Sequence, residues 1–343
     1  MSSPRPSQAS DPVRPGPVAG SPLEERLRRW VVAVFPRDAG PQVAYDAPAG
    51  DPGLFGPGSV TWRIHADLPG MLAGGLGALM LQTLHPLALA GVWDHSDFRR
   101  DLVGRLRRTT AFVAATSYAP RAEAERMIAL VRGIHARVRG HAPDGRAYSA
   151  DDPRLLTWVH VTEAMSFLRG FEAYGPMRPG AAQIDAYYAE SARVAEALGA
   201  RDVPRSHAEV QAFLRDIRPE LAWTARSAEV LQVLAAMRLP VPAGGLGREL
   251  FLGAGAAILP EWARAMIPRG PLARARDAAA AATLKAGAGA IRRAMREGIA
   301  PRACVRMGLE PASLLQRWPG PDEQAEAWPD DAARAAAPAD QRE

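Results

Sequence analysis

One uncharged apolar stretch constrains the fold of this 343-residue chain more than any other feature. The residues from Gly70 to Trp93 carry no charge, and only Gln82, Thr83 and His85 interrupt the apolar run. Such a run is long enough to span a membrane or to form the central helix of a helical domain. The polar cluster in its middle would lack hydrogen-bond partners in lipid, which favours the buried helix.

Two further features of this stretch describe the helix that it predicts. Glycine or alanine at positions 74, 75, 77 and 78 thins one side, which lets neighbouring helices approach closely. Pro86 lacks the N–H that would bond the carbonyl of Gln82, so we expect a kink there in a helix over 70–92. A histidine at the kink of a buried helix is where a helical protein would place a pocket.

The composition favours an all-α fold. Ala, Leu, Arg and Glu abound, while runs rich in Val, Ile and Thr are scarce. Hydrophobic residues make up 48% and charged residues 23%, which is ordinary for a globular protein. We expect a disordered tail at 1–22, one multi-helix domain at 23–317 around the Pro-kinked helix, and a second disordered tail at 318–343.

The charged residues and cysteines limit the partners and the compartment. The formal charge of +5 comes almost wholly from arginine, since Lys285 is the only lysine, and no basic cluster with interleaved aromatic residues indicates a nucleic-acid partner. The single cysteine, Cys304, allows no internal disulfide and suggests a reducing compartment. The N-terminus lacks the apolar core of a signal peptide, so we expect a cytoplasmic protein that touches but does not span a membrane.

Common catalytic and cofactor motifs are absent from the sequence. It has no Gly-rich phosphate loop, no CxxCH for covalent haem, no HExxH and no GxSxG. The single cysteine also excludes a thiolate zinc site. Intrahelical histidines and one face with arginine and threonine remain, which is a plausible haem or metal environment.

Two helices carry the first candidate site residues. A helix over 97–117 places Arg105 and Thr109 on one face, beside its buried stripe. His135 points inward on a helix over 120–140, where a lone histidine is more often a satisfied core residue than a ligand.

A third helix begins after Asp152, with proline at its favoured first position. His160 and Glu163 share one face of this helix at i, i+3, where they could hydrogen-bond to each other. The segment SVTWRIHAD at 59–67 precedes the central helix, and its simplest interpretation is a capping loop packed by its tryptophan.

Six segments resemble one protein family in order and spacing: SVTWRIHAD, LQTLHPLALAGVWDHSDFRRD, GRLRRTTAFV, IHARVRG, LLTWVHVTEAMSF and LPEWAR. The family is that of the MpaB-like proteins and rubber oxygenases (latex-clearing proteins), and the resemblance covers residues 45–300. It implies an all-α catalytic domain with non-covalent haem b in a globin-like pocket between helices. The rubber oxygenases cleave isoprenoid double bonds with dioxygen, and fungal MpaB-like members oxidatively shorten a prenyl-derived side chain.

The same resemblance assigns roles to individual residues. His135 matches the proximal iron ligand, and Arg105 and Thr109 match an Arg-x-x-Lys-Thr element that precedes it. Arg108 replaces the lysine of that element, and arginine is a poor ligand because it stays protonated, so we expect no lysine-capped haem. Arg105 would neutralise a haem propionate or stabilise negative charge on bound oxygen, and Thr109 would hydrogen-bond in the pocket.

We therefore expect a haem-b-dependent oxygenase that acts with dioxygen on a hydrophobic small molecule such as an isoprenoid, with a redox partner that the sequence does not name. His85 is the candidate distal acid/base group, and His160 is a further cofactor-binding candidate. Two alternatives stay open. One is a non-haem iron oxygenase that uses His85, His160 and Glu163, and the other is a non-enzymatic helical protein that binds lipid or a membrane through 246–266.

Overall fold

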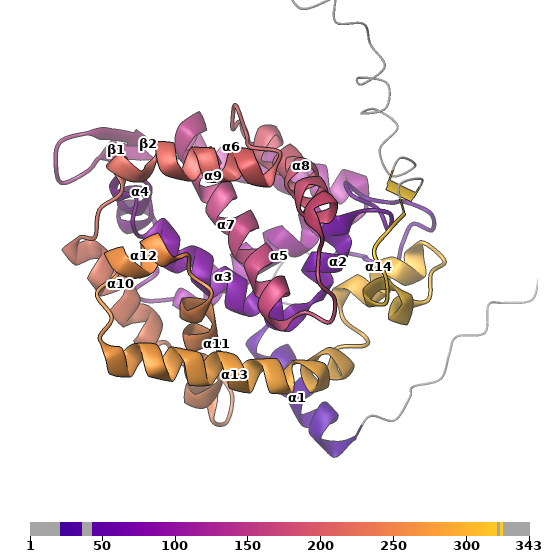
Figure 1. Ribbon diagram of the computed structural model, residues 1–343. Helices are drawn as coiled ribbons and strands as arrows, with labels where there is room; N and C mark the ends of the chain where they lie inside the picture. Colours follow the sequence, from indigo (N-terminus) through magenta and orange to yellow (C-terminus); the bar gives the residue numbers. More distant parts are fainter. Residues whose placement is uncertain (1–20, 36–42, 321–322, 325–343) are drawn as a thin grey trace, which may run out of the picture.

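The chain folds as the predicted all-α single domain, with one two-stranded hairpin (Figure 1). The computed structural model describes residues 21–35, 43–320 and 323–324, and nearly all of the two expected tails lie outside them. The elements are α1 (Pro22–Val34), α2 (Val60–Ala66), α3 (Leu68–Gln82), α4 (Pro86–His95), α5 (Leu102–Tyr118), α6 (Arg121–His135), β1 (Arg139–His141), β2 (Ala147–Ser149), α7 (Pro153–Tyr174), α8 (Ala181–Leu198), α9 (His207–Asp216), η1 (Arg218–Glu220), α10 (Ala225–Ala236), α11 (Gly244–Ala257), α12 (Glu261–Met266), α13 (Pro271–Ala294), α14 (Ile299–Arg306) and η2 (Pro311–Leu315).

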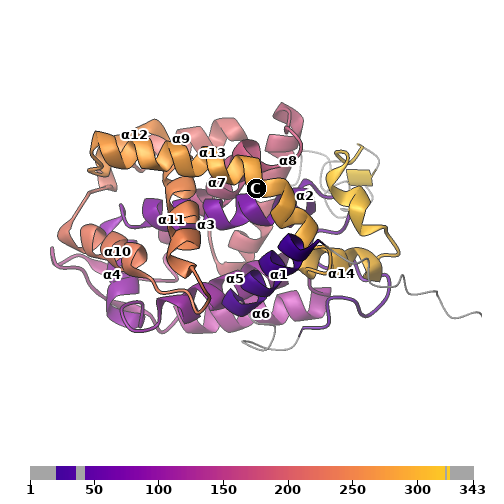
Figure 2. The same ribbon diagram turned by 90° about the horizontal axis from the view of Figure 1, so that it is seen from below.

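Helix α3 lies at the centre of the fold, enclosed by α7, α11 and α13 (Figures 1 and 2). Its glycines permit this close packing. A Cβ added at Gly74 would lie 2.6 Å from the carbonyl oxygen of Ser166 on α7, and one at Gly77 would lie 3.1 Å from the carbonyl oxygen of Gly255 on α11. The prediction of a buried helix with one thinned side is confirmed.

The apolar stretch is broken rather than kinked at its proline. Helix α3 ends at Gln82, and α4 starts at Pro86. His85 between them has extended backbone angles, φ −95° and ψ 109°, and is the N-cap of α4. A residue before proline avoids the helical region because its backbone would clash with the proline ring. The single helix that was predicted over 70–92 is therefore two helices, α3 and α4.

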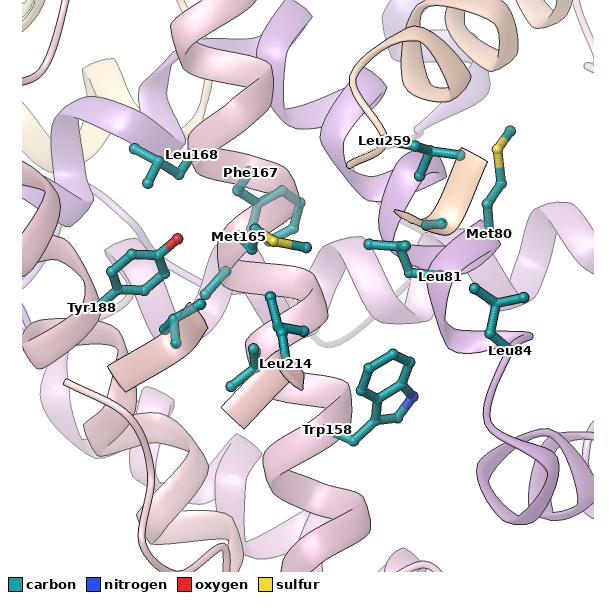
Figure 3. Close-up of a cluster of buried hydrophobic side chains, with 14 of the residues drawn as sticks. Met80, Leu81, Leu84, Trp158, Met165, Phe167, Leu168, Tyr188, Leu214 and Leu259 are labelled. Atoms are coloured by element: carbon teal, nitrogen blue, oxygen red, sulfur yellow. The ribbon is translucent and has the colours of Figure 1, made fainter. Parts of the chain in front are cut away.

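The largest hydrophobic core lies between α7 and its neighbours, and Figure 3 shows part of it. Trp158 and Phe171 of α7 are wholly buried, and Leu81 of α3 and Leu84, two residues beyond the end of α3, pack in the same cluster. Asp152 starts α7 as predicted, since its side chain accepts from the backbone N–H groups of residues 154 and 155. The long helix α7 is thus fixed at its start by a cap and along its length by packing.

Three local predictions were wrong. The segment at 59–67 is not a loop, because Ser59 accepts from the N–H of Trp62 and caps the short helix α2. The helix predicted to reach residue 140 ends at His135, and the chain then forms the β1–β2 hairpin. The apolar helix predicted over 246–266 is divided into α11 and α12 just before Glu261.

No single helix in the described part of the chain combines the length and the apolar character of a membrane span. The pair α2 and α3 passes on length and composition together, but the two helices are bent by 89° at their junction.

Candidate active site

One face of α7 carries two titratable side chains without partners. His160 and Glu163 are half-buried, and neither makes a hydrogen bond or an ion pair with any residue that the structure describes. Burial lowers the pKa of His160 to about 4 and raises the pKa of Glu163 to about 7. The expected hydrogen bond between the two is not formed, so both groups are available to a ligand.

His65, on α2, lies next to the same face of α7. Its ring packs edge-on against Phe167, with centroids 5.3 Å apart, and Phe167 follows Glu163 by one helical turn. Nδ1 of His65 lies 2.7 Å from Oγ of Ser117 on α5, and Nε2 lies 3.1 Å from the hydroxyl oxygen of Tyr187 on α8. Side chains of three helices therefore hold this ring in place.

The hydrogen bonds of Ser117 fix the tautomer of His65. The Ser117 hydroxyl donates to the carbonyl oxygen of Val113 at 2.6 Å, so its oxygen must accept from Nδ1–H of His65. Burial lowers the pKa of His65 to about 3, which keeps the ring neutral. Nε2 is then the acceptor, and the Tyr187 hydroxyl donates to it.

A buried carboxylate positions α2, and hence His65. Glu190 of α8 accepts from the backbone N–H groups of Val60 and Thr61 and from the hydroxyl of Thr61. These bonds satisfy N–H groups at the start of α2, which a helix leaves without internal partners. The helix is only seven residues long, so this support from α8 determines where His65 lies.

His135 is the last residue of α6 and is half-buried. Its Nδ1 is buried without a hydrogen-bond partner, and burial lowers the pKa of the ring, an effect that Asp151 opposes. Helices α5 and α6 pack together across a two-residue connection and are therefore antiparallel. This arrangement puts Arg105, near the start of α5, at the same end of the helix pair as His135.

Arg105 and Thr109 face different surroundings. Arg105 donates to Oγ of Ser96 at 2.7 Å, and burial lowers the pKa of its guanidinium. It lines a cavity of about 60 Å³ together with Val159, the residue before His160. The Thr109 side chain is exposed and donates to the carbonyl oxygen of Arg105 at 3.2 Å. Neither Thr109 nor His135 lines this cavity, so the predicted common wall is not formed there.

His85 lies on the other side of α7. Its ring is wholly buried against Trp158, with centroids 5.9 Å apart, and His160 is about 200° further round the helix. The structure therefore does not bring His85 to His160 and Glu163. Within the described ranges, no group of three or more His, Cys, Asp or Glu residues could hold a metal ion, which removes the support for a non-haem iron site at these three residues.

Comparison with known proteins decides the family. A model of the catalytic domain described as "ER-bound oxygenase mpaB/B'/Rubber oxygenase" matches residues 62–293. The chain belongs to the mpaB/rubber oxygenase family. No curated protein matches the chain, and no solved structure does.

The mpaB/rubber oxygenase match confirms the resemblance of the six sequence segments and identifies an oxygenase-type catalytic domain. The matched range runs from α2 to α13 and includes all the candidate residues described above. Sequence reasoning missed His65, Ser117 and Tyr187. The sequence drew attention to His65 as an unusual residue for a linker, but 59–67 was assigned to a loop, so no role was predicted for it. Ser117 and Tyr187 lie in predicted helices and have no feature in the sequence that marks them as site residues.

Proposed function

We propose that the protein is a haem-b-dependent oxygenase that acts with dioxygen on a hydrophobic small molecule, an isoprenoid in the first instance. The proposal is carried by the oxygenase family together with three side chains to which no described residue hydrogen-bonds: His135, whose Nδ1 is buried, and the half-buried His160 and Glu163. Burying Nδ1 of His135 without a partner costs about 1–3 kcal/mol, so its retention argues for a ligand.

The residues present fit a haem. His135 offers an imidazole with a buried, partnerless Nδ1, and it is the residue that we propose would hold the iron. Arg105, at the same end of the α5–α6 pair, would supply a cation for a propionate, while the exposed Thr109, one turn further on, would offer the oxygen of a hydroxyl that already donates to the Arg105 carbonyl. When bound, the iron would supply the dioxygen chemistry, while the apolar walls select a hydrophobic substrate.

The chain's own residues on α7 and α2 provide groups that can handle protons. Glu163 has a pKa of about 7, so its carboxyl group is partly protonated near neutral pH and can give or take a proton. His160 stays neutral under the same conditions and can accept a hydrogen bond. The Tyr187–His65–Ser117 chain holds the neighbouring wall in one hydrogen-bonded arrangement. These groups replace His85 as the acid/base candidates.

One measurement tests the proposal directly. The full chain, expressed with a haem precursor and purified, should carry haem with a Soret band and about one iron per chain. Iron without a Soret band would replace haem with a non-haem centre. A protein without iron and without a Soret band, even after reconstitution with haemin, would reject the proposal and favour a non-enzymatic lipid-binding role.

A further inference from the structure

The loop between α10 and α11 is uncharged and largely exposed. From Leu239 to Gly247 it reads LPVPAGGLG, with Arg238 before it and Arg248 after it. Leu246 is 71% exposed, the highest value among the large hydrophobic side chains that the structure describes. A leucine side chain gains stability when it leaves water, and here the fold leaves it in water. The loop therefore presents an apolar contact that the folded chain does not use.

Helix α1 lies against this loop and widens the exposed surface (Figures 1 and 2). Nε1 of Trp30 donates to the carbonyl oxygen of Pro242 at 3.3 Å. A Cβ added at Gly247 would lie 2.5 Å from the Trp30 ring, so the two segments are in direct contact. Trp30 is half-buried, and a tryptophan with a satisfied N–H and a partly open ring suits a membrane–water interface. We name residues 22–34 and 238–249 together the α1–α11 surface.

The α1–α11 surface carries an excess of positive charge. It holds five arginines and three glutamates, which leaves a net charge of +2. Each of the glutamates is paired with an arginine: Glu24 with Arg293 of α13, Glu25 with Arg28, and Glu249 with Arg248. Arg26 and Arg238 are exposed, and neither makes an ion pair with a residue of the described ranges. The surface therefore attracts anions, and less strongly as the salt concentration rises.

The small extent of the apolar contact favours a lipid partner over a protein. A stable protein interface buries about 800 Å² on each partner. The apolar contact here centres on one leucine, because the following part of α11 is buried at Phe251 and from Gly253 to Ala256. A projecting apolar loop flanked by arginines can instead enter the head-group region of a membrane and meet anionic lipid there.

We propose that the α1–α11 surface docks onto a membrane that contains anionic lipid. Leu246 enters the boundary between head groups and acyl chains, Trp30 lies at the level of the head groups, and Arg26 and Arg238 contact lipid phosphates. The contact is peripheral, since no single described helix has the length and apolar character of a membrane span. The docking is independent of haem, because the proposed haem-binding residues lie on α5 and α6 and not on this surface.

Vesicle sedimentation tests the proposal with the purified full chain. Vesicles of phosphatidylcholine alone are compared with vesicles of equal parts phosphatidylcholine and phosphatidylglycerol, an anionic lipid. The chain should bind the mixed vesicles at least about tenfold more tightly, and added salt should weaken that binding. No binding to the mixed vesicles, or equal binding to both kinds, would overturn the proposal. Neither result would affect the haem proposal.

Two matched variants locate the contact. Leu246→Gln should weaken binding to the mixed vesicles at least about tenfold, since it removes the apolar side chain that enters the membrane. Leu272→Gln makes the same change at a leucine that is 67% exposed at the start of α13, and it should bind like the unchanged chain. Arg26→Gln combined with Arg238→Gln should remove most of the preference for the anionic vesicles. Equal weakening in the two leucine variants would overturn the assignment to this surface.

A fluorescent label distinguishes insertion into lipid from contact with protein. Cys304 is buried, so an environment-sensitive dye reacts with the cysteine of Leu246→Cys or, as the control, of Leu272→Cys. With mixed vesicles the dye at position 246 should become brighter and shift to the blue, while the dye at position 272 should not change. An unchanged dye at position 246 would overturn the insertion. A dimer that is lost in Leu246→Gln, without vesicle binding, would assign the loop to a second copy of the chain.

Discussion

The two sides of α7 differ in how far their side chains are buried. On one side, Trp158, Val161 and Met165 are at most 3% exposed and belong to the largest core cluster (Figure 3). On the other side, about half a turn away, His160 and Glu163 are half-buried and have no partner among the described residues. The same helix thus carries a packed side and an open side.

This contrast separates residues that hold the fold together from residues that we propose serve a ligand. Apolar side chains gain stability from burial alone, at about 25 cal/mol per Å². Histidine and glutamate lose free energy when they are buried without partners. Ionised Glu163, whose pKa burial raises, therefore weakens the folded protein. The His65 ring and Tyr187, which border the open side, are fully hydrogen-bonded and so give it a fixed wall.

The largest effect is expected in haem retention, where His135 of α6 is compared with His160 on the open side of α7. His135→Ala should lose most of its haem, because the proposed axial ligand is removed. His160→Ala should keep haem, although its activity falls. Both variants are purified with a matched haem supply, and the haem-to-protein ratio is compared. Full occupancy with an unchanged spectrum in His135→Ala, together with loss in His160→Ala, would move the axial ligand to α7.

Thermodynamic stability should respond strongly to a substitution on the packed side and weakly to one on the open side. Trp158→Ala leaves a large cavity in the packed side and should lower the free energy of unfolding by about 3–5 kcal/mol. His160→Ala removes a partnerless polar ring and should change it by less than about 1 kcal/mol. Urea unfolding of the haem-free proteins measures both values. Equal losses in the two variants would show that the open side is packed as tightly as the other.

The burial of the central helix α3 could be predicted, because it follows from the pattern of residues along that helix. An uncharged run with glycines on one side can only be buried among close neighbours, and α3 is buried in this way. Pro86 correctly located the interruption of the apolar stretch, but a sequence does not show whether a proline kinks a helix or ends it. The outcome depended on whether α4 packs in line with α3, which is a matter of tertiary contacts.

The site was only partly predictable. The spacing of residues along the sequence shows which of them share a face of one helix, but it does not show which residues of other helices pack against that face. The shared face of His160 and Glu163 is confirmed, but the hydrogen bond between them is not formed. His85 seemed suited to the same pocket because of the kink, yet it packs against the far side of α7. His65 depends on bonds to Ser117 and Tyr187, which are 52 and 122 residues away in the chain.

A pH dependence should distinguish Glu163 from an ordinary surface carboxylate. Its pKa is about 7 in the folded protein against 4.5 for a free glutamate side chain, so the folded state binds more protons than the unfolded state between these values. Stability therefore falls as pH rises from 4.5 to 7 and stays lowered above it, by about 3 kcal/mol at most. Glu163→Gln should remove this loss and be the more stable protein at pH 8.

The control for this prediction is Glu172→Gln on the same helix, at an exposed position. Thermal unfolding of the haem-free proteins is followed at pH 5 and pH 8. The difference between Glu163→Gln and the unchanged chain should grow with pH, while Glu172→Gln should follow the unchanged chain. A parallel response of the two variants would mean that Glu163 is well solvated.

The smallest effect concerns the hydrogen-bonded wall at His65. Tyr187→Phe removes the donor to Nε2 of His65 and should cost about 1 kcal/mol of stability, the usual value for one hydrogen bond. Tyr188→Phe is the matched control, since this neighbouring buried tyrosine makes no hydroxyl hydrogen bond with the described residues.

Nitrogen NMR of the His65 ring reports the tautomer in each protein. Nδ1–H should persist in Tyr187→Phe, because Ser117 still accepts from it, while the Nε2 signal shifts as its donor is lost. Loss of the tautomer, or an equal stability cost in Tyr188→Phe, would show that the wall is held by packing and not by the Tyr187–His65–Ser117 chain.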